Sequence, residues 1–200
     1  MRLFVAIDLD EAARAASSQC ARDLARRVDV APKYPSVRWV AEEQLHFTVC
    51  FLGDVPAPQI EDLRSVLRAP WGIGAFTASL EGVDVFPFSG PPRVIWLGMG
   101  DGRDQLHALR GELAGRLNRC GLETPSRPFR PHLTLGRANR TVTDSGTALR
   151  SLVRAQVAPN TRWRVDRVSL YESRLSPGGS VYRVVECESL RGAGGTIEGG

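Results

Sequence analysis

The segment LHFTVCFLG, residues 45–53, carries the sequence pattern that decides the fold. Apolar residues alternate there with His46 and Thr48, which is typical of a strand with one face in the core. The same pattern, His-apolar-Thr-apolar, returns in HLTLG at residues 132–136. The chain is therefore expected to contain two matching strands, each with one imidazole and one hydroxyl on the same face.

The segments around the two motifs repeat in the same order: strand, helix, strand, helix, strand. In the first half, alternation predicts strands near residues 3–7, 45–53 and 76–86, and helical periodicity predicts helices over residues 11–28 and 59–68. In the second half, the corresponding strands are expected over residues 93–99, 132–136 and 161–171, and the helices around residues 106–117 and 145–156. A last predicted strand, residues 180–188, has no counterpart in the first half.

An internal duplication makes the two halves pseudo-equivalent and places their matching strands side by side around a pseudo-two-fold axis. We expect one two-lobed unit over residues 1–190, with halves at about 1–90 and 91–190. The halves should fold together because a site with one histidine from each half needs both. The tail, residues 191–200, has almost nothing to bury and is expected to be disordered.

Composition excludes several classes of protein. The 200 residues are 42% hydrophobic and 24% charged, which is typical of a globular domain. No apolar run approaches the roughly 18 residues of a membrane span, and the N-terminus lacks the features of a signal peptide, so we expect a cytoplasmic protein. The net charge of +4 permits a nucleic-acid partner without requiring one. The four cysteines form no C-x-x-C pair and are expected to be reduced.

The duplicated motif predicts acid–base chemistry. Imidazole has an ordinary pKa near 6.5, so one histidine of a pair can accept a proton while the other donates one. His46 and His132 could then hydrolyse a phosphodiester, with Thr48 and Thr134 holding the phosphoryl oxygens, and no metal or other cofactor is required.

Several segments together resemble the two-histidine phosphoesterase superfamily, within it the RNA 2′,3′-cyclic phosphodiesterase, or 2′-5′ RNA ligase-like, family. The resemblance covers residues 2 to about 188. It is carried by RLFVAIDL at the start, LHFTVCFLGDV, RVIWLGM, RPFRPHLTLGR and, near the end, LYESRLSPGGSVY. It implies an α+β fold of two pseudo-symmetric lobes, each an antiparallel β-sheet with outer helices, around a central cleft.

The resemblance also implies roles for single residues. His46 would donate a proton to the leaving 3′ oxygen and His132 would accept one from water, opening a 2′,3′-cyclic phosphate to a 2′-phosphate. Thr48, Thr134 and Arg137 would contact the phosphate. The implied partner is RNA or a nucleotide with a 2′,3′-cyclic phosphate end, and we expect a monomer with no obligatory protein partner.

Alternation within the two strands leaves a question about four neighbouring residues. Phe51, which we expect to stack on a base, and Arg137 each lie five residues after a histidine, so they reach the cleft only if their strands end or bulge before them. Strict alternation instead directs Arg130 and Cys50 to the catalytic face. Arg130 is a further candidate for substrate binding. Cys50 is expected to be a half-buried small residue, because nothing nearby in sequence would lower its pKa.

Three other readings remain open. The same acid and base could join RNA ends through 2′-5′ linkages, which is the reverse reaction. The chain could bind RNA ends without turnover, although a binding module has no need of two proton carriers. A metallohydrolase that uses His46 and His132 as ligands is the third reading, but no H-E-x-x-H motif or carboxylate cluster supports it.

Overall fold

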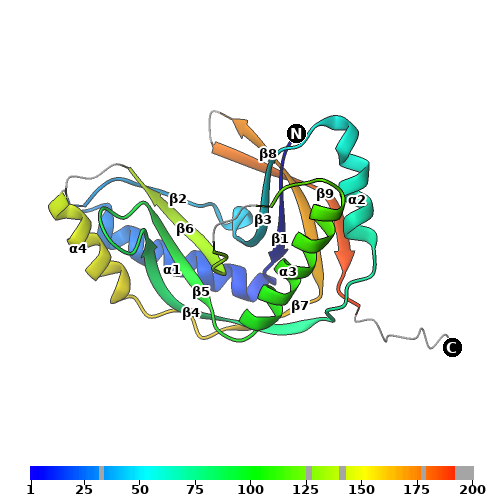
Figure 1. Ribbon diagram of the computed structural model, residues 1–200. Coiled ribbons are helices and arrows are strands. Elements are labelled where there is room, and N and C mark those ends of the chain that lie inside the picture. Colours follow the sequence, from blue (N-terminus) through cyan, green and yellow to red (C-terminus); the bar gives the residue numbers. More distant parts are fainter. Residues whose placement is uncertain (32–33, 125–127, 140–142, 177–178, 192–200) are drawn as a thin grey trace.

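The computed structural model describes residues 1–31, 34–124, 128–139, 143–176 and 179–191, and within them the strands form one curved antiparallel sheet (Figure 1). Its order is β7-β4-β5-β6-β3-β1-β8-β9, and β2 pairs with β6. The strands are β1 (Arg2–Asp8), β2 (Val37–Trp39), β3 (His46–Asp54), β4 (Phe76–Phe86), β5 (Val94–Met99), β6 (His132–Ala138), β7 (Arg162–Val165), β8 (Arg167–Ser176) and β9 (Gly179–Ser189). The helices are α1 (Glu11–Val28), α2 (Ile60–Arg68), α3 (Arg103–Arg119) and α4 (Thr143–Arg154), with 3₁₀ turns η1 (Glu42–Gln44) and η2 (Ala57–Gln59).

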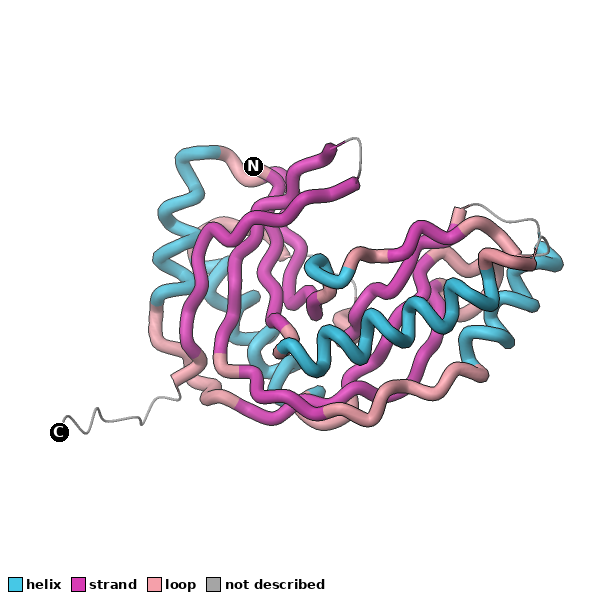
Figure 2. Tube along the Cα trace, turned by 180° about the vertical axis from the view of Figure 1, so that it is seen from behind, coloured by secondary structure: helices cyan, strands magenta, loops and turns pink. Residues whose placement is uncertain are grey.

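The sheet is divided into two lobes, which we name after their histidines. The His46 lobe contains β1, β3, β8 and β9, and the His132 lobe contains β2, β4, β5, β6 and β7. Helix α3 contacts β3 and α2 contacts β9, whereas α1 contacts β2, β6 and β7 and α4 contacts β4. Figure 2 shows α1 running across the outer face of the His132 lobe. This confirms the expected α+β fold of two antiparallel lobes with outer helices.

The lobes differ from the two halves of the chain, so the expected division near residue 90 does not describe them. Strand β4 belongs to the first half but pairs with β5 of the second, and β8 of the second half pairs with β1. Helices α1 and α3 likewise cover the lobe of the opposite half. Periodicity shows which side of an element is buried, but it does not show which sheet covers that side.

One predicted strand was wrong in its extent. Residues 161–171 read as a single strand, but the structure divides this segment at Asp166 into β7, which pairs with β4, and β8, which pairs with β1. The chain crosses from one lobe to the other at this point. No glycine or proline marks the crossing, so the sequence gives no signal of it.

Of the tail expected to be disordered, residues 192–200 lie outside the described residues.

Candidate active site

The two histidine motifs meet where the lobes join. Strand β3 pairs with β6 through Phe47 and Leu133, whose side chains are fully buried. Because the strands are antiparallel, this register places His46 beside Thr134 and Thr48 beside His132. The duplication is thus visible in the structure as a pseudo-two-fold axis through the pair Phe47–Leu133. The expectation that the matching strands lie side by side is confirmed.

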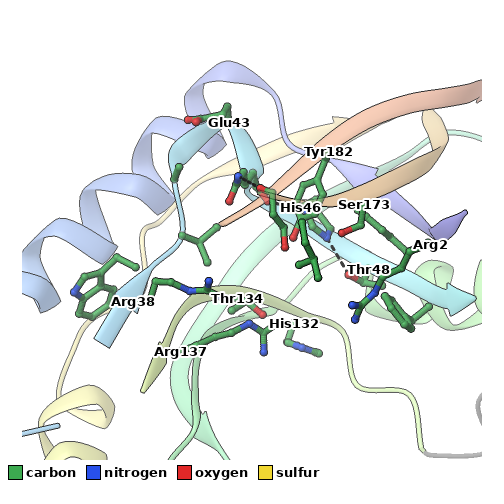
Figure 3. A pocket seen from close by; sticks show the side chains of 18 residues that line it. Arg2, Arg38, Glu43, His46, Thr48, His132, Thr134, Arg137, Ser173 and Tyr182 are labelled. Carbon is green, nitrogen blue, oxygen red and sulfur yellow. Dashed lines mark hydrogen bonds between the residues drawn. The ribbon is translucent and has the colours of Figure 1, made fainter. Parts of the chain in front are cut away.

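Each imidazole is oriented by a backbone carbonyl two residues earlier in the chain. His46 Nδ1 lies 2.8 Å from the carbonyl oxygen of Gln44, and His132 Nδ1 lies 2.7 Å from that of Arg130. A carbonyl only accepts, so both Nδ1 atoms carry hydrogen and donate it. Nε2 of each ring is then the atom left for chemistry. His46 Nε2 lies 3.0 Å from Thr48 Oγ1, the contact drawn in Figure 3.

Aromatic rings enclose His46 and affect its charge. Phe4 stacks on the imidazole with a centroid separation of 4.8 Å, and Tyr182 meets it edge-on at 5.4 Å. This burial lowers the pKa of His46 below its ordinary value of 6.5. The Gln44 carbonyl and the Asp8 carboxylate act in the opposite direction, because both favour the protonated ring.

His132 has an aromatic wall of its own, but its charged neighbour has the opposite sign. Phe86 meets the ring edge-on at 5.1 Å, and Trp96 lies at 6.4 Å. Burial again lowers the pKa from 6.5, the Arg130 carbonyl raises it, and the Arg137 guanidinium lowers it further. A carboxylate therefore favours the charged form of His46, and a guanidinium favours the neutral form of His132.

Two equivalent bulges turn the fifth residue after each histidine into the cleft. In β3 the pairing with β1 passes from Thr48 to Cys50 with one extra residue, and in β6 the pairing with β5 passes from Thr134 to Gly136 in the same way. An extra residue reverses the alternation beyond it. Phe51 and Arg137 consequently line the same cavity as the two histidines.

The bulge in β3 turns Cys50 away from the catalytic face, so the expectation from strict alternation was wrong for this residue. Cys50 is only 2% exposed and belongs to the hydrophobic core. Burial raises the pKa of the thiol, so the reactive thiolate is disfavoured. Cys50 is a core residue, and it is buried more completely than expected.

The cleft has a volume of about 590 Å³ and is lined from both lobes (Figure 3). His46, Thr48, His132 and Thr134 all lie on its wall. The sequence reading missed several other lining residues. These include Arg2, Phe4, Arg38, Gln44, Ser173 and Tyr182. Arg2 and Arg38 come from strands with no repeated motif, so only the pairing of β1 and β2 with the motif strands could have revealed them.

Arg130 contributes its backbone to the site and directs its side chain elsewhere. Its carbonyl accepts from His132, while its guanidinium lies over the Phe88 ring at 5.0 Å from the centroid. The side chain borders a neighbouring cavity that also contains Trp96.

Phe51 is 42% exposed in the cleft, with the Arg2 guanidinium 5.1 Å from its ring centroid.

Neither a metal-binding cluster nor a membrane-spanning helix is found in the described part of the chain. Within those ranges, no three His, Cys, Asp or Glu side chains come together in a group that could hold a metal ion. No described helix is both long enough and apolar enough to cross a membrane.

Comparison with known proteins gives a consistent result. Residues 5–176 match the family model of the 2′-5′ RNA ligase superfamily. The chain is 33% identical over 190 residues to a Thermotoga maritima protein named RNA 2′,3′-cyclic phosphodiesterase, covering 94% of this chain and 95% of the relative. It is 32% identical over 206 residues to a Thermus thermophilus protein of the same name, covering 98% and 93%.

Solved structures agree with the sequence comparisons. A crystal structure of a Thermus thermophilus protein superposes with a TM-score of 0.79 at 30% identity, covering 96% of this chain and all of the other. Escherichia coli LigT, solved in complex with 3′-AMP, gives a TM-score of 0.72 at 29% identity, covering 94% and 97%.

Proposed function

The chain belongs to the 2′-5′ RNA ligase superfamily, and we propose that it hydrolyses 2′,3′-cyclic phosphate ends of RNA to 2′-phosphates. Relatives that match along nearly the whole chain are named RNA 2′,3′-cyclic phosphodiesterase. The observation that carries the proposal is the pair of imidazoles that line one cleft, with both Nδ1 atoms bound to backbone carbonyls. Both Nε2 atoms are then available for proton transfer.

The reaction needs one proton acceptor and one proton donor. Neutral His132 accepts a proton from water through Nε2, and the water oxygen forms a bond to phosphorus. The bond between phosphorus and the 3′ oxygen breaks, and protonated His46 gives its Nε2 proton to that oxygen. The product carries a 2′-phosphate and a 3′-hydroxyl. Proton exchange with solvent then restores both rings.

The charges around the two rings support this division of roles. Asp8 favours the protonated form of His46, which is the state a donor needs. Arg137 favours the neutral form of His132, which is the state an acceptor needs. Asp8 is the carboxylate that favours a charged His46, against the positive charges of Arg14 and His132, and no carboxylate among the described residues plays this part at His132.

Hydroxyl and guanidinium donors complete the proposed site. Thr48, Thr134 and Arg137 line the cleft beside the imidazoles and would hold the non-bridging phosphoryl oxygens. Phe51 would stack on a base of the substrate. Arg130, with its side chain on Phe88, would meet the substrate from the neighbouring cavity. A metal-independent reaction, a monomeric state and a cytoplasmic location stay predictions.

A product analysis tests the proposal. We expect an oligoribonucleotide with a 2′,3′-cyclic phosphate end to yield the 2′-phosphate, separated from the 3′-phosphate by chromatography and checked with a phosphatase. Single His46→Ala and His132→Ala variants should lose about 10²- to 10⁴-fold in activity. Arg27→Ala is the control, because this arginine is exposed on α1, away from the cleft, and should leave activity unchanged.

Several results would contradict the proposal. Full activity in the His46→Ala, His132→Ala double variant would show that neither histidine carries a proton in the reaction. Joined product in excess of hydrolysis, when cleaved RNA halves are supplied, would favour the ligase reading. Tight, salt-sensitive RNA binding without turnover would favour a binding module, and loss of turnover after chelation would favour a metallohydrolase.

A further inference from the structure

Two arginines stand side by side at one end of the cleft. Arg38 of β2 and Arg137 of β6 are direct partners in the pairing of those strands, and both line the cavity. Figure 3 shows both side chains directed into the cavity from the same end. Like charges directly across two strands are destabilising unless something of opposite charge lies between them.

The protein itself supplies no such charge in the part that the structure describes. Neither Arg38 nor Arg137 forms an ion pair with a described carboxylate, whereas arginines elsewhere on the surface do, such as Arg68 with Glu186 and Arg154 with Asp84. Glu43 is the carboxylate among the residues that line the cleft, and Figure 3 shows it pointing away from Arg38. The pair is therefore left for an anion from outside the chain.

We propose that Arg38 binds a second phosphate of the substrate, the phosphodiester one nucleotide upstream of the cyclic end, so that the enzyme prefers oligonucleotides to mononucleotides. This inference rests on the proposed function. A cyclic phosphate carries one negative charge and two non-bridging oxygens, and Thr48, Thr134 and Arg137 are already assigned to them. The reacting phosphate therefore has enough donors without Arg38, and the guanidinium of Arg38 is free to bind another anion.

The position of Arg38 supports the assignment to a separate phosphate. The imidazoles flank the Phe47–Leu133 pair, while Arg38 pairs with the residue four positions further along β6. At about 3.3 Å per residue, the backbones of both arginines lie up to roughly 13 Å along the sheet from that pair. Arg137 is on the strand that carries His132 and is assigned to the reacting phosphate, whereas Arg38 is one strand away from it and is placed to reach the next phosphate. Beyond the Phe47–Leu133 pair, β2 takes the place of β3 as the neighbour of β6. The cleft therefore extends towards Arg38.

The test compares two substrates that differ by one nucleotide, and so by one adenosine and one phosphodiester: adenosine 2′,3′-cyclic phosphate and the dinucleotide ApA with a 2′,3′-cyclic end. We expect Arg38→Ala to lower kcat/KM for the dinucleotide about 10- to 100-fold, the range of a charge-assisted hydrogen bond. The mononucleotide should change less than about twofold. An uncharged methylphosphonate linkage in the dinucleotide should cost the wild type the same factor and cost the variant nothing.

The controls separate this inference from other outcomes. Arg27→Ala removes an exposed arginine on α1, away from the cleft, and should leave both substrates unaffected. Equal losses on both substrates, or no loss on either, would overturn the assignment. If the wild type hydrolyses neither substrate, the proposed function fails. Binding of a fluorescent dinucleotide with a 2′-phosphate end, compared with its methylphosphonate analogue, would then still decide whether Arg38 contacts the second phosphate.

Discussion

Asp8 lies directly across from His46 in the pairing of β1 with β3. Its carboxylate accepts hydrogen bonds from Tyr171 Oη at 2.6 Å and from Ser169 Oγ at 3.2 Å, so two hydroxyls hold it beside the imidazole. Burial and the positive charges of Arg14 and His132 disfavour protonation of His46, and Asp8 opposes them. The carboxylate thus keeps available the charge state that a proton donor needs.

The first prediction concerns the pH dependence of kcat/KM, which reports the free enzyme. Because both histidine pKa values are lowered from 6.5, the optimum should lie on the acid side of pH 6.5. Asp8→Asn keeps the shape of the side chain and removes its charge, so the basic limb, set by His46, should shift to lower pH. The acid limb, set by His132, should stay in place.

Asp104→Asn is a suitable control for this profile, because Asp104 is an exposed carboxylate in the first turn of α3. The charged and aromatic groups that face His46 come from other elements, namely Phe4, Asp8, Arg14, His132, Tyr171 and Tyr182. A basic limb that does not move in Asp8→Asn, or an acid limb that moves instead, would show that Asp8 does not support the donor.

A second prediction concerns stability. Both histidines have a lower pKa in the folded protein than the ordinary 6.5 expected after unfolding. As the pH falls through 6.5, the unfolded chain binds protons first, so the free energy of unfolding should decrease. Urea unfolding at pH 7.5 and 5.5 measures this decrease. It should be smaller in a His46→Gln, His132→Gln double variant, and an equal decrease in both proteins would contradict the attribution.

The sequence was a better guide to the motif strands than to their surroundings. Alternation around His46 and His132 is local, and it correctly placed both histidines on strands that meet. The bulges after Thr48 and Thr134 depend on pairing with β1 and β5, so only the flanking glycines hinted at them. Arg38 reaches the cleft because a three-residue strand pairs with β6, and such long-range pairing leaves no periodic signal.

The third prediction is that Cys50 takes no part in catalysis. Cys50→Ala removes a sulfur atom from a buried position, so we expect a loss of stability of about 1 kcal/mol and activity within a few-fold of the wild type. The raised pKa of the buried thiol also predicts slow modification by a thiol-alkylating reagent. Cys120 is an exposed cysteine and should react first. A hundredfold loss of activity in Cys50→Ala would place the thiol in the mechanism.

The last prediction concerns Gly136, where β2 pairs with β6. A Cβ atom at this position would lie 2.7 Å from Val37 Cγ1, closer than carbon atoms approach, and 3.0 Å from the Trp39 ring, a very tight contact. Gly136→Ala should therefore push β2 away from β6 and cost about 1–3 kcal/mol of unfolding free energy. Because β2 carries Arg38, the displacement should also lower kcat/KM for the ApA dinucleotide more than for the mononucleotide.

Gly111 provides the matched control for this substitution. It is exposed on α3, and a Cβ atom there would meet nothing within 4 Å. Gly111→Ala should stabilise the protein by up to about 1 kcal/mol, because alanine restricts the unfolded chain and favours the helix. Thermal and urea unfolding of both variants would measure the contrast. If Gly136→Ala is as stable as Gly111→Ala, β2 is not held closely against β6, and the placement of Arg38 beside Arg137 loses its structural basis.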